Sequence, residues 1–479
     1  MKIHIFRGPR GPVFLAFVLL VFLVCDCKPA ESPESRDPGA VTAEGLLSAP
    51  VLLANGESTV YAIVRLGTIA RPPQQRGPVN VALAIDTSGS MEGEAIVAAR
   101  KSAEKVVDSL ADGDRLSIVA YSSKAELLLP SEEVSSSTRA EARKKIAAIE
   151  ARGTTAMGEG LDLALGQVGS HYDAKGINRV VLLGDGIPND ASRIEYAAQS
   201  AGQRGIAITT VGLGLDYDEV LMGSIAATSG GRYRYVEAPE KLAGFFKEEL
   251  GRIDSVYGRH AAATLTPGPG VRIDSVVGGT SNGNSAYIPI GDITRGDARD
   301  IVVKLTVKPR KAGVPIELLD ATVTFDDALE EAGRLERHIY FGAHTTTDEG
   351  AVAKAKRPDV DLAAALAEAS ATTIQAVGLS KQGQYSTARS MLTKAADAAV
   401  AQAKLTPSTE LEKLAENMRT VAKDMPEADA PKPAAKAPSG YEFSDDVLQS
   451  GQVAPAPMEA PVVVKRRKEV HQQAIDQLY

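Results

Sequence analysis

Apolar runs alternate with longer segments of helical periodicity between residues 79 and 255. These runs are mainly apolar, which is typical of strands that are buried on both faces of a parallel sheet. They read VNVALAI, RLSIVAY, RVVLLG, IAITTVGL and RYRYV. The helical patterns between them cover residues 92–111, 137–150, 158–169, 190–203, 218–228 and 239–253. This alternation predicts an α/β domain whose doubly wound, mainly parallel sheet is covered by helices on both faces.

Two regions of different pattern follow this α/β domain. Residues 259–345 contain short runs of alternating polarity between Gly and Pro turns, and they predict a small antiparallel β domain, a sandwich. Residues 359–425 have helical periodicity and predict a helical hairpin. One helix of this hairpin has an apolar face formed by Tyr385, Ala388, Met391, Leu392 and Ala395. The other begins near Thr406 and Pro407 and carries Leu411, Leu414, Met418 and Val421.

The segments that flank these regions are more polar. Residues 28–78 predict a Pro-rich tether and a strand pair, with Asn55 and Gly56 as the hairpin turn between APVLLANGEST and TVYAIVRLGTIA. Residues 426–479 predict a Pro- and Ala-rich linker and a tail. The tail ends in VVVKRRKEVHQQAIDQLY, which predicts a short terminal helix. We interpret its KRRK motif as a solvated basic stretch, with contact to acidic lipid or to a partner as the alternative.

The chain begins with basic residues that are followed by twelve apolar ones, Val13 to Val24. This run has the length of a signal peptide and is too short to cross a bilayer comfortably, so residues 1–27 predict export. A buried core segment is the alternative interpretation. The two cysteines, Cys25 and Cys27, stand where the run ends, and none follows. A disulfide framework is therefore excluded in the mature domains.

The end of the apolar run resembles a bacterial lipoprotein signal, in which the cysteine after the hydrophobic segment is lipidated and becomes the new N-terminus. Leu23 and Val24 depart from the small residue that this signal prefers before its cysteine. The resemblance implies lipidation of Cys25, with Cys27 as the other candidate, and anchorage to a membrane of the cell envelope. Asp26 implies retention at the inner membrane, by the sorting rule of enteric bacteria. An ordinary cleaved peptide and an uncleaved anchor are the alternatives.

The overall charge argues against nucleic acid as a partner. The 479 residues include 53 Lys and Arg against 61 Asp and Glu, which gives a formal net charge of -8. Binding to a duplex relies on clustered basic side chains that neutralise phosphates. A hydrophobic content of 44% and a charged content of 24% leave room for two or three globular domains.

An oxygen-rich stretch, DTSGSM, follows the first apolar strand. A strand that leaves the sheet at Ile85 presents Asp86 at the sheet edge where ligands of parallel sheets collect. A turn through the next residues points Ser88 and Ser90 toward the same place. Carboxylate and hydroxyl oxygens suit a hard cation such as Mg²⁺. The alternative is an ordinary capped helix that starts near Met91.

Two later stretches contain further oxygen ligands. RGTTAMGEGLDLAL offers Thr154 and Thr155 in a Gly-flanked turn, and VVLLGDGIPND places Asp185 after another apolar strand. With these three loops, residues 79–255 resemble the von Willebrand factor type A family. The metal-ion-dependent adhesion site of that family combines an Asp-x-Ser-x-Ser loop, a Thr from a second loop and an Asp from a third. DRLSIVAY and TVGLGLDYDEVLMGSIAATSGG also resemble segments of the family.

This resemblance implies a complete site for Mg²⁺ or Mn²⁺ whose ligands are Asp86, Ser88, Ser90, Thr155 and Asp185. Thr154 is the less favoured alternative to Thr155. Two carboxylates balance the charge of a divalent cation and three hydroxyls add neutral oxygens. In the family, one coordination position is then left for water or for a Glu or Asp of a partner protein.

These implications lead to one functional hypothesis and two alternatives. We expect a divalent-cation-dependent protein-binding or adhesion module of the bacterial cell envelope, and not an enzyme. The first alternative is a periplasmic scaffold or assembly factor for an envelope complex, which the long tail and the helical hairpin favour. The second is a serine hydrolase, for which Ser102 and Lys105 in SAEK provide a lone Ser-x-x-Lys motif. The six histidines lack the spacing of a zinc site.

Two details near the end of the α/β domain are also predicted. Asp216 and Asp218 either extend a cation site or cap the helix that begins near Glu219, and the cap is favoured. The helix at residues 239–253 closes the domain. By analogy with integrin relatives, we hypothesise that this helix shifts when a ligand binds.

Overall fold

The computed structural model describes residues 37–70, 77–184, 188, 191–215, 217–236, 242–253, 255–277, 279–330, 332–427, 429 and 460–478. These residues belong to one compact unit, Asp37–Tyr479. The predicted export signal at residues 1–27, with Cys25 and Cys27, lies outside the described residues. Asp185, the ligand expected from the third metal loop, also lies outside them.

The α/β part of the fold is built on a six-stranded sheet with the order β6-β5-β4-β7-β8-β9. Its strands are β4 (Val79–Asp86), β5 (Arg115–Tyr121), β6 (Ala125–Glu133), β7 (Ile177–Gly184), β8 (Ala207–Leu213) and β9 (Tyr233–Val236). All neighbouring pairs except β5 and β6 are parallel. β4 and β7 are buried along their whole length, as their mainly apolar sequences predict for central parallel strands.

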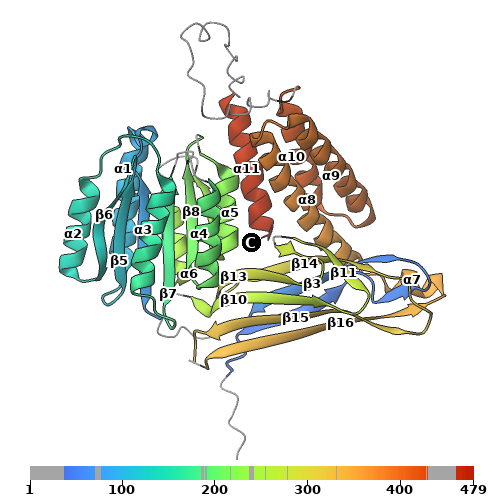
Figure 1. Ribbon diagram of the computed structural model, residues 1–479. Helices are drawn as coiled ribbons and strands as arrows, with labels where there is room; N and C mark the ends of the chain where they lie inside the picture. The colour runs from blue at the N-terminus through green and yellow to red at the C-terminus, as the bar shows by residue number, and fades with distance from the viewer. Residues whose placement is uncertain are drawn as a thin grey trace, which may run out of the picture. The chain divides into compact units, whose positions relative to one another are not determined.

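Helices cover both faces of this sheet (Figure 1). They are α1 (Glu94–Ser109), α2 (Ser136–Ala147), α3 (Met157–Ser170), α4 (Ala191–Gln203), α5 (Glu219–Ser229) and α6 (Leu242–Ile253). One hydrophobic core joins the sheet to α1, α2 and α6, and a second core joins its other face to α3, α4 and α5. The predicted fold class, a doubly wound and mainly parallel sheet, is confirmed.

The edge strand β6 is absent from the sequence prediction. It pairs antiparallel with β5 at the end of the sheet. Pro130 interrupts its sequence, AELLLPSEE, and proline lacks the backbone N–H that a central strand needs. An edge strand tolerates proline because only one of its sides is hydrogen bonded within the sheet. Pro130 therefore removes the sequence signal of a strand, although a strand can still form at the edge of the sheet.

Two further sheets share one hydrophobic core and form a β-sandwich. Their orders are β1-β3-β14-β11 and β12-β13-β10-β15-β16-β2. The first sheet contains β1 (Val41–Leu47), β3 (Ser58–Thr68), β14 (Ala298–Val307) and β11 (Val271–Val276). The second contains β12 (Thr280–Ser281), β13 (Ala286–Thr294), β10 (Val256–Pro267), β15 (Pro315–Asp327), β16 (Arg334–Thr346) and β2 (Val51–Leu53). The N-terminal strands thus belong to the same sandwich as the strands that follow the α/β domain.

The hairpin predicted around Asn55 and Gly56 is wrong. Asn55 does adopt the positive φ of a turn residue, 64°. However, β2 pairs parallel with β16, whereas β3 pairs with β1 and β14. The chain therefore crosses at this turn from one sheet of the sandwich to the other. The local turn signal is correct, but the pairing partners lie far away in the sequence.

The C-terminal region contains α7 (Glu349–Ala355), α8 (Pro358–Lys381), α9 (Tyr385–Leu405), α10 (Thr409–Asp424) and α11 (Pro461–Leu478). α8, α9, α10 and α11 contribute to one core, so the predicted hairpin is part of a small helical bundle. Ser408 caps α10 by accepting a hydrogen bond from the Leu411 N–H at 3.2 Å. The cap expected at Thr406 is wrong because Thr406 still ends α9, donating its N–H to the Gln402 carbonyl at 2.9 Å.

Among the described residues, α8 is long and apolar enough to cross a membrane, with a mean hydropathy of 1.3 over its most apolar window. The helix packs against α9 and α11, and Ala369 and Ala376 are buried in their shared core. This packing buries 39% of the apolar window.

Candidate metal site

The polar stretch after β4 lies at the point where the sheet connections change direction. β4 leads to α1 on one face of the sheet, and its neighbour β7 leads to α4 on the other face. The carboxyl ends of two such strands form the place where α/β sheets bind ligands. Asp86 and Ser88 are buried there, whereas Ser90 is exposed.

Hydrogen bonds fix the shape of this first loop. The N–H of Ser88 donates to Oδ1 of Asp86 at 2.8 Å, and the hydroxyl oxygens of Ser88 and Ser90 lie 3.0 Å apart. The chain then makes a 3-10 turn, Gly89–Met91, to which Ser88 gives no side-chain cap. α1 starts only after this turn. The two hydroxyls therefore face each other and do not serve as an ordinary helix cap.

The second loop, residues 151–156, is hydrogen bonded to the first. The N–H of Gly89 donates to the carbonyl of Gly153 at 3.0 Å. In the opposite direction, the N–H of Arg152 donates to the carbonyl of Thr87 at 2.7 Å. The structure thus brings together two loops that lie more than fifty residues apart in the sequence.

The two threonines of the second loop have different environments. Thr154 is exposed, and both its N–H and its hydroxyl donate to the Ser123 hydroxyl oxygen, at 3.1 and 3.3 Å. Thr155 is half-buried, and its hydroxyl has no hydrogen bond to any other residue in the described part of the chain. The next residue, Ala156, is held by its N–H donating to the Ser122 carbonyl at 2.6 Å.

The strand that leads to the third predicted ligand ends beside Asp86. β7 pairs in register with β4 and ends at Gly184, directly before Asp185 in the sequence. A Cβ atom on Gly184 would lie 2.7 Å from the Tyr121 hydroxyl oxygen and 3.2 Å from Oδ2 of Asp86. Glycine is therefore required for the close approach of β7 to these two side chains.

The oxygen atoms of the first loop fit a hard divalent cation. Mg²⁺ holds octahedral ligands at about 2.1 Å, so two adjacent ligands lie about 3.0 Å apart. The hydroxyl oxygens of Ser88 and Ser90 lie 3.0 Å apart, the length of the hydrogen bond between them, and this separation would also suit two adjacent ligands. Within the described ranges, no group of three or more His, Cys, Asp and Glu side chains is arranged to hold a metal. The carboxylate and hydroxyl oxygens near Asp86 are of the kind that divalent cations take as ligands.

The C-terminal helix α11 docks on the α/β domain through buried charges. Glu219, at the start of α5, is fully buried and accepts hydrogen bonds from Arg467 Nε and Lys468 Nζ, both at 3.0 Å. Lys381 at the end of α8 lies 3.0 Å from the same carboxylate. Lys468 also donates to the carbonyl of Tyr217 at 2.9 Å. The interpretation of KRRK as a solvated stretch is wrong for Arg467 and Lys468.

The helical period explains why these basic residues are buried. Lys468, His471, Ile475 and Leu478 recur at spacings of three or four and share the packed face of α11. The sequence contains this signal. However, a basic residue on an apolar stripe predicts burial only when its carboxylate partner is known, and Glu219 lies far away in the sequence.

Burial and charge shift the pKa values in this cluster in different directions. Burial alone would raise the pKa of Glu219, but attraction to Lys468, Lys381 and Arg467 outweighs burial and holds that pKa well below its ordinary value. Burial lowers the pKa of Lys468 to about 8, against the attraction of Glu219. Burial also lowers the pKa of His471 to about 4. At neutral pH the carboxylate is charged and His471 is neutral.

The helix α11 also covers the edge strand β9. The side chain of Gln472 accepts a hydrogen bond from the Tyr235 N–H at 2.7 Å and donates to the Tyr233 carbonyl at 3.3 Å. Gln472 thus forms the backbone hydrogen bonds that a neighbouring strand would otherwise form with β9.

The predicted cap of α5 is also present. Asp218 accepts hydrogen bonds from the Val220 and Leu221 N–H groups, both at 3.1 Å, as expected. Asp216 lies outside the described residues.

A second buried ion network holds α6, the helix that closes the domain. Glu249 of α6 accepts from Arg179 of β7 at 2.6 Å and from the Thr209 hydroxyl at 3.0 Å. Arg179 also donates to Asp292 of β13 at 2.7 Å. Separating one partner from a buried pair costs about 3–5 kcal/mol. The hypothesised ligand-driven shift of this helix remains a prediction, and it would have to overcome these contacts.

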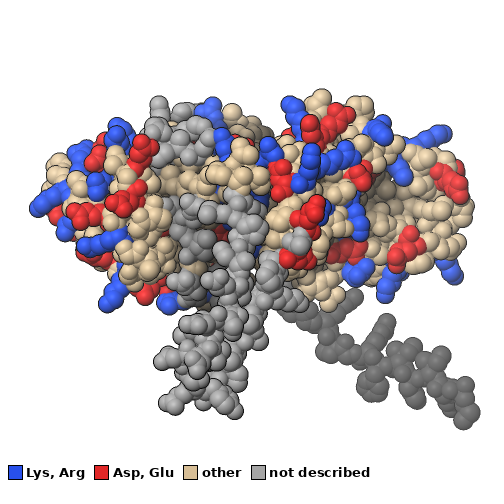
Figure 2. Space-filling view, turned by 90° about the horizontal axis from the view of Figure 1, so that it is seen from above, with Lys and Arg blue, Asp and Glu red and all other residues tan. Residues whose placement is uncertain are grey.

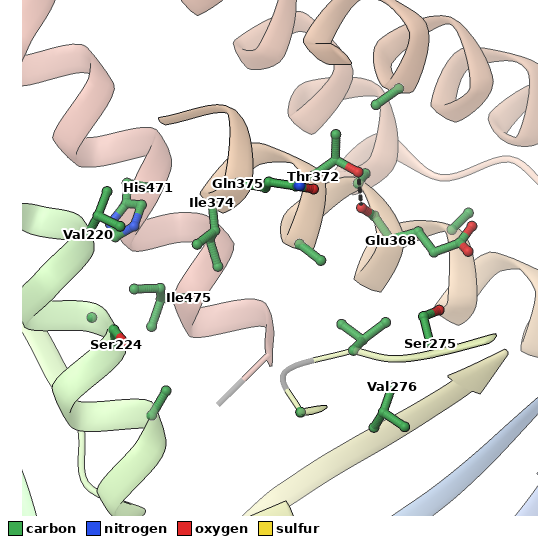
Figure 3. A pocket seen from close by; sticks show the side chains of 18 of the residues that line it. Val220, Ser224, Ser275, Val276, Glu368, Thr372, Ile374, Gln375, His471 and Ile475 are labelled. Atoms are coloured by element: carbon green, nitrogen blue, oxygen red, sulfur yellow. Dashed lines mark hydrogen bonds between the residues drawn. The ribbon is translucent and has the colours of Figure 1, made fainter. Parts of the chain in front are cut away.

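A cavity of about 1290 Å³ lies between α5, α8, α11 and the β-sandwich. Figure 3 shows Val220 and Ser224 of α5, Ile374 of α8, Ile475 of α11 and Val276 of β11 around it. None of the predicted metal ligands among the described residues lines this cavity. The cavity is therefore separate from the candidate metal site.

The Ser-x-x-Lys motif does not form a catalytic pair. Ser102 is buried in the middle of α1, whereas Lys105 is exposed. A nucleophile and its base need to share one site within hydrogen-bonding reach. The different environments of the two side chains therefore give the serine-hydrolase alternative no support.

The doubly wound sheet with ligand loops at its switch point defines an α/β domain of the von Willebrand factor type A class. Residues 80–248 match the family of the von Willebrand factor type A domain, and the chain contains such a domain. Domains of this family are generally metal-dependent protein-interaction modules and are typically not enzymes.

Sequence relatives share this part of the chain. The uncharacterized protein YfbK of Escherichia coli (strain K12) is 27% identical over 248 residues, which cover 49% of this chain and 43% of YfbK. The uncharacterized protein sll0103 of Synechocystis is 27% identical over 205 residues, which cover 42% of this chain and 48% of that protein. The chain thus spans less than half the length of each of these relatives.

Two solved structures share the fold over most of the chain. A von Willebrand factor type A protein from Catenulispora acidiphila has a TM-score of 0.65 at 22% identity and covers 80% of this chain and 90% of its own. The ArnB paralog VWA2 from Sulfolobus acidocaldarius has a TM-score of 0.57 at 16% identity and covers 91% and 98%. The fold similarity therefore extends beyond the α/β domain.

Proposed function

We propose that the von Willebrand factor type A domain of this chain binds a partner protein through a divalent cation. The observation that carries the proposal is the junction at the end of β4. There, hydrogen bonds join the loop of Asp86, Ser88 and Ser90 to the loop of Thr155. β7 ends at Gly184 on the same edge of the sheet. The ion is Mg²⁺ or Mn²⁺.

Each predicted ligand has a defined chemical role in this proposal. Asp86 and Asp185 balance the charge of the ion, and Ser88, Ser90 and Thr155 add neutral oxygens. The environment of Thr155 supports its choice over Thr154, whose hydroxyl is already bonded to Ser123. When bound, the ion supplies a coordination position for a Glu or Asp carboxylate of the partner. Recognition then depends on the cation.

Isothermal titration calorimetry with Mg²⁺ and with Mn²⁺ tests the metal site. We expect the wild type to bind one ion and Asp86→Ala to bind at least about a hundredfold more weakly, since a charged ligand is lost. Asp112→Ala is the matched control, because Asp112 is exposed and pairs with Arg139 on the surface. Equal binding by the wild type and Asp86→Ala would refute the metal assignment.

A pull-down from envelope extract tests the protein partner. The full chain should retain a specific protein in Mg²⁺ and release it in EDTA, and Asp86→Ala bait should not retain it. Nucleic acid is not the expected partner. Figure 2 shows Lys and Arg interspersed with Asp and Glu over the face seen from above, rather than a continuous basic field.

The N-terminal sequence supports a location in the cell envelope. We expect export and anchorage to a membrane by a lipid on Cys25 or Cys27, or by an uncleaved signal, at the periplasmic or outer face. Mass spectrometry of the mature N-terminus tests the lipid. An unmodified peptide that begins beyond Cys27 would exclude lipidation.

A periplasmic scaffold or assembly factor is the second candidate function. It is favoured by the docking of α11 across both the α/β domain and the helical bundle, which joins these parts into one compact unit. Treatment of intact cells with protease distinguishes the two functions. An adhesin on the outside is cleaved, whereas a periplasmic scaffold is spared.

A further inference from the structure

Tyr121 is the last residue of β5 and the register partner of Asp86 in the β4–β5 pair. Its side chain is completely buried, with 0% of its surface exposed. We propose that Tyr121 is a positioning residue that fixes the first two metal loops and the strand leading to the third relative to one another. This inference rests on the proposed metal function and adds a residue that contributes no ligand atom.

The main chain of Tyr121 holds the first loop. Its carbonyl oxygen accepts a hydrogen bond from the Thr87 N–H at 2.8 Å and a second from the Thr87 hydroxyl at 3.1 Å. Thr87 stands between the predicted ligands Asp86 and Ser88. This double contact therefore fixes the backbone at the point where the loop turns away from the sheet.

The ring of Tyr121 supports the second loop. Gly160 lies in the first turn of α3, directly after the loop of Thr155. A Cβ atom on Gly160 would lie 2.5 Å from Cδ1 of the Tyr121 ring, so the helix backbone rests against the ring. The residue after Tyr121, Ser122, accepts the N–H of Ala156 at 2.6 Å. The start of α3 is thus held from two sides.

The hydroxyl group of Tyr121 holds the strand that leads to the third loop. It donates to the carbonyl of Leu183 at 2.7 Å. Leu183 precedes Asp185 by two residues in the sequence. Since β4 lies between β5 and β7 in the sheet, the side chain reaches across the end of β4 to make this bond. One residue therefore contacts the first loop, the helix that follows the second loop and the strand that leads to the third.

Phenylalanine at this position would keep two of the three contacts. The ring and the main chain would remain, and the hydroxyl bond to Leu183 would be lost. The carbonyl of Leu183 would then lack its buried donor, and the approach to the third loop would be less fixed. The loss of one neutral buried hydrogen bond in a supporting position predicts about five- to tenfold weaker metal binding.

The test compares Tyr121→Phe with Tyr233→Phe in the full chain. Tyr233 is also buried, and its hydroxyl shares a 2.7 Å hydrogen bond with Tyr217. It stands on the edge strand β9, separated from β7 by β8. Both variants lose one buried hydroxyl, so both should lower the melting temperature of the metal-free protein. Only Tyr121→Phe should weaken Mn²⁺ binding in calorimetry, by about five- to tenfold.

Three outcomes separate this inference from the proposed function. If the wild type binds no Mg²⁺ or Mn²⁺, the proposed metal function itself fails. If the wild type binds Mn²⁺ and Tyr121→Phe binds within twofold of it, or if Tyr233→Phe is weakened equally, the positioning role is refuted. If Tyr121→Phe does not fold, Thr87→Val decides, because it removes only the 3.1 Å hydroxyl bond to the Tyr121 carbonyl. This variant should weaken binding by about two- to threefold, and wild-type affinity would refute the role.

Discussion

Mild acid should loosen the docking of α11 because of one histidine. His471 is fully buried, and burial lowers its pKa from 6.5 to about 4. Between these two pH values the unfolded chain binds a proton at this position and the folded chain does not. Stability therefore falls as the pH drops below 6.5 and continues to fall until the folded histidine is protonated near pH 4.

The size of this effect follows from the shift. One pKa unit corresponds to about 1.4 kcal/mol, so the full shift corresponds to about 3 kcal/mol. At pH 5 the expected loss relative to pH 7.5 is about 2 kcal/mol. Glu219 adds little at pH 5, because its lowered pKa matters only below the ordinary value of 4.5. The other charged groups that act on His471 are Lys468, Lys381 and Arg467.

Urea unfolding at pH 7.5 and pH 5.0 measures the loss. His471→Phe keeps an aromatic ring against Tyr233, with which the histidine ring makes an edge-on contact at 5.7 Å. This variant should lose about 2 kcal/mol less than the wild type on acidification. His338→Phe, at an exposed histidine beside Glu336, should lose as much as the wild type. Equal losses in the wild type and His471→Phe would refute the reasoning.

The remaining predictions concern the buried carboxylate and the glycine beside the metal loops. Glu219→Gln removes the partner of three cations, so the free energy of unfolding in urea should fall by about 3 kcal/mol or more, and a loss below about 1 kcal/mol would contradict this. Adding Lys468→Met to that variant should restore part of the loss. Gly184→Ala places a methyl group 2.7 Å from the Tyr121 hydroxyl oxygen, which should lower both the melting temperature and Mn²⁺ affinity. Gly166→Ala is its control, because nothing lies within 4 Å of the added atom, and helix propensity should raise stability by about 0.5–1 kcal/mol.

The sequence predicts those parts of the fold whose signals are local. The buried strands β4, β5, β7 and β8 are mainly apolar runs, and helices α1, α4 and α6 are amphipathic, so periodicity locates these elements. The first metal loop can also be recognised in the sequence, because Asp86 follows directly after an apolar strand. The hydrogen bonds between this loop and the second loop cannot be predicted from the sequence, because they join backbone atoms that are brought together by the register of the sheet.

The features that escaped prediction depend on distant partners. β2 has a turn signal at Asn55, but its pairing with β16 is decided by the packing of two sheets. Arg467 and Lys468 look solvated until Glu219 is placed beside them. Tyr121 looks like an ordinary strand residue, and only the neighbouring strands show that its hydroxyl reaches Leu183. In each case the physical cause is a contact between segments that the sequence separates widely.

The contact between Gln472 and β9 has a consequence for biosynthesis. The ribosome completes the whole α/β domain before it reaches α11, so β9 emerges with the N–H of Tyr235 and the carbonyl of Tyr233 unsatisfied. An open strand edge is a template for aggregation. A nascent or exported chain therefore needs protection at this edge until α11 arrives. A product truncated before Pro461 would retain every predicted metal ligand and still be a target for proteolytic quality control.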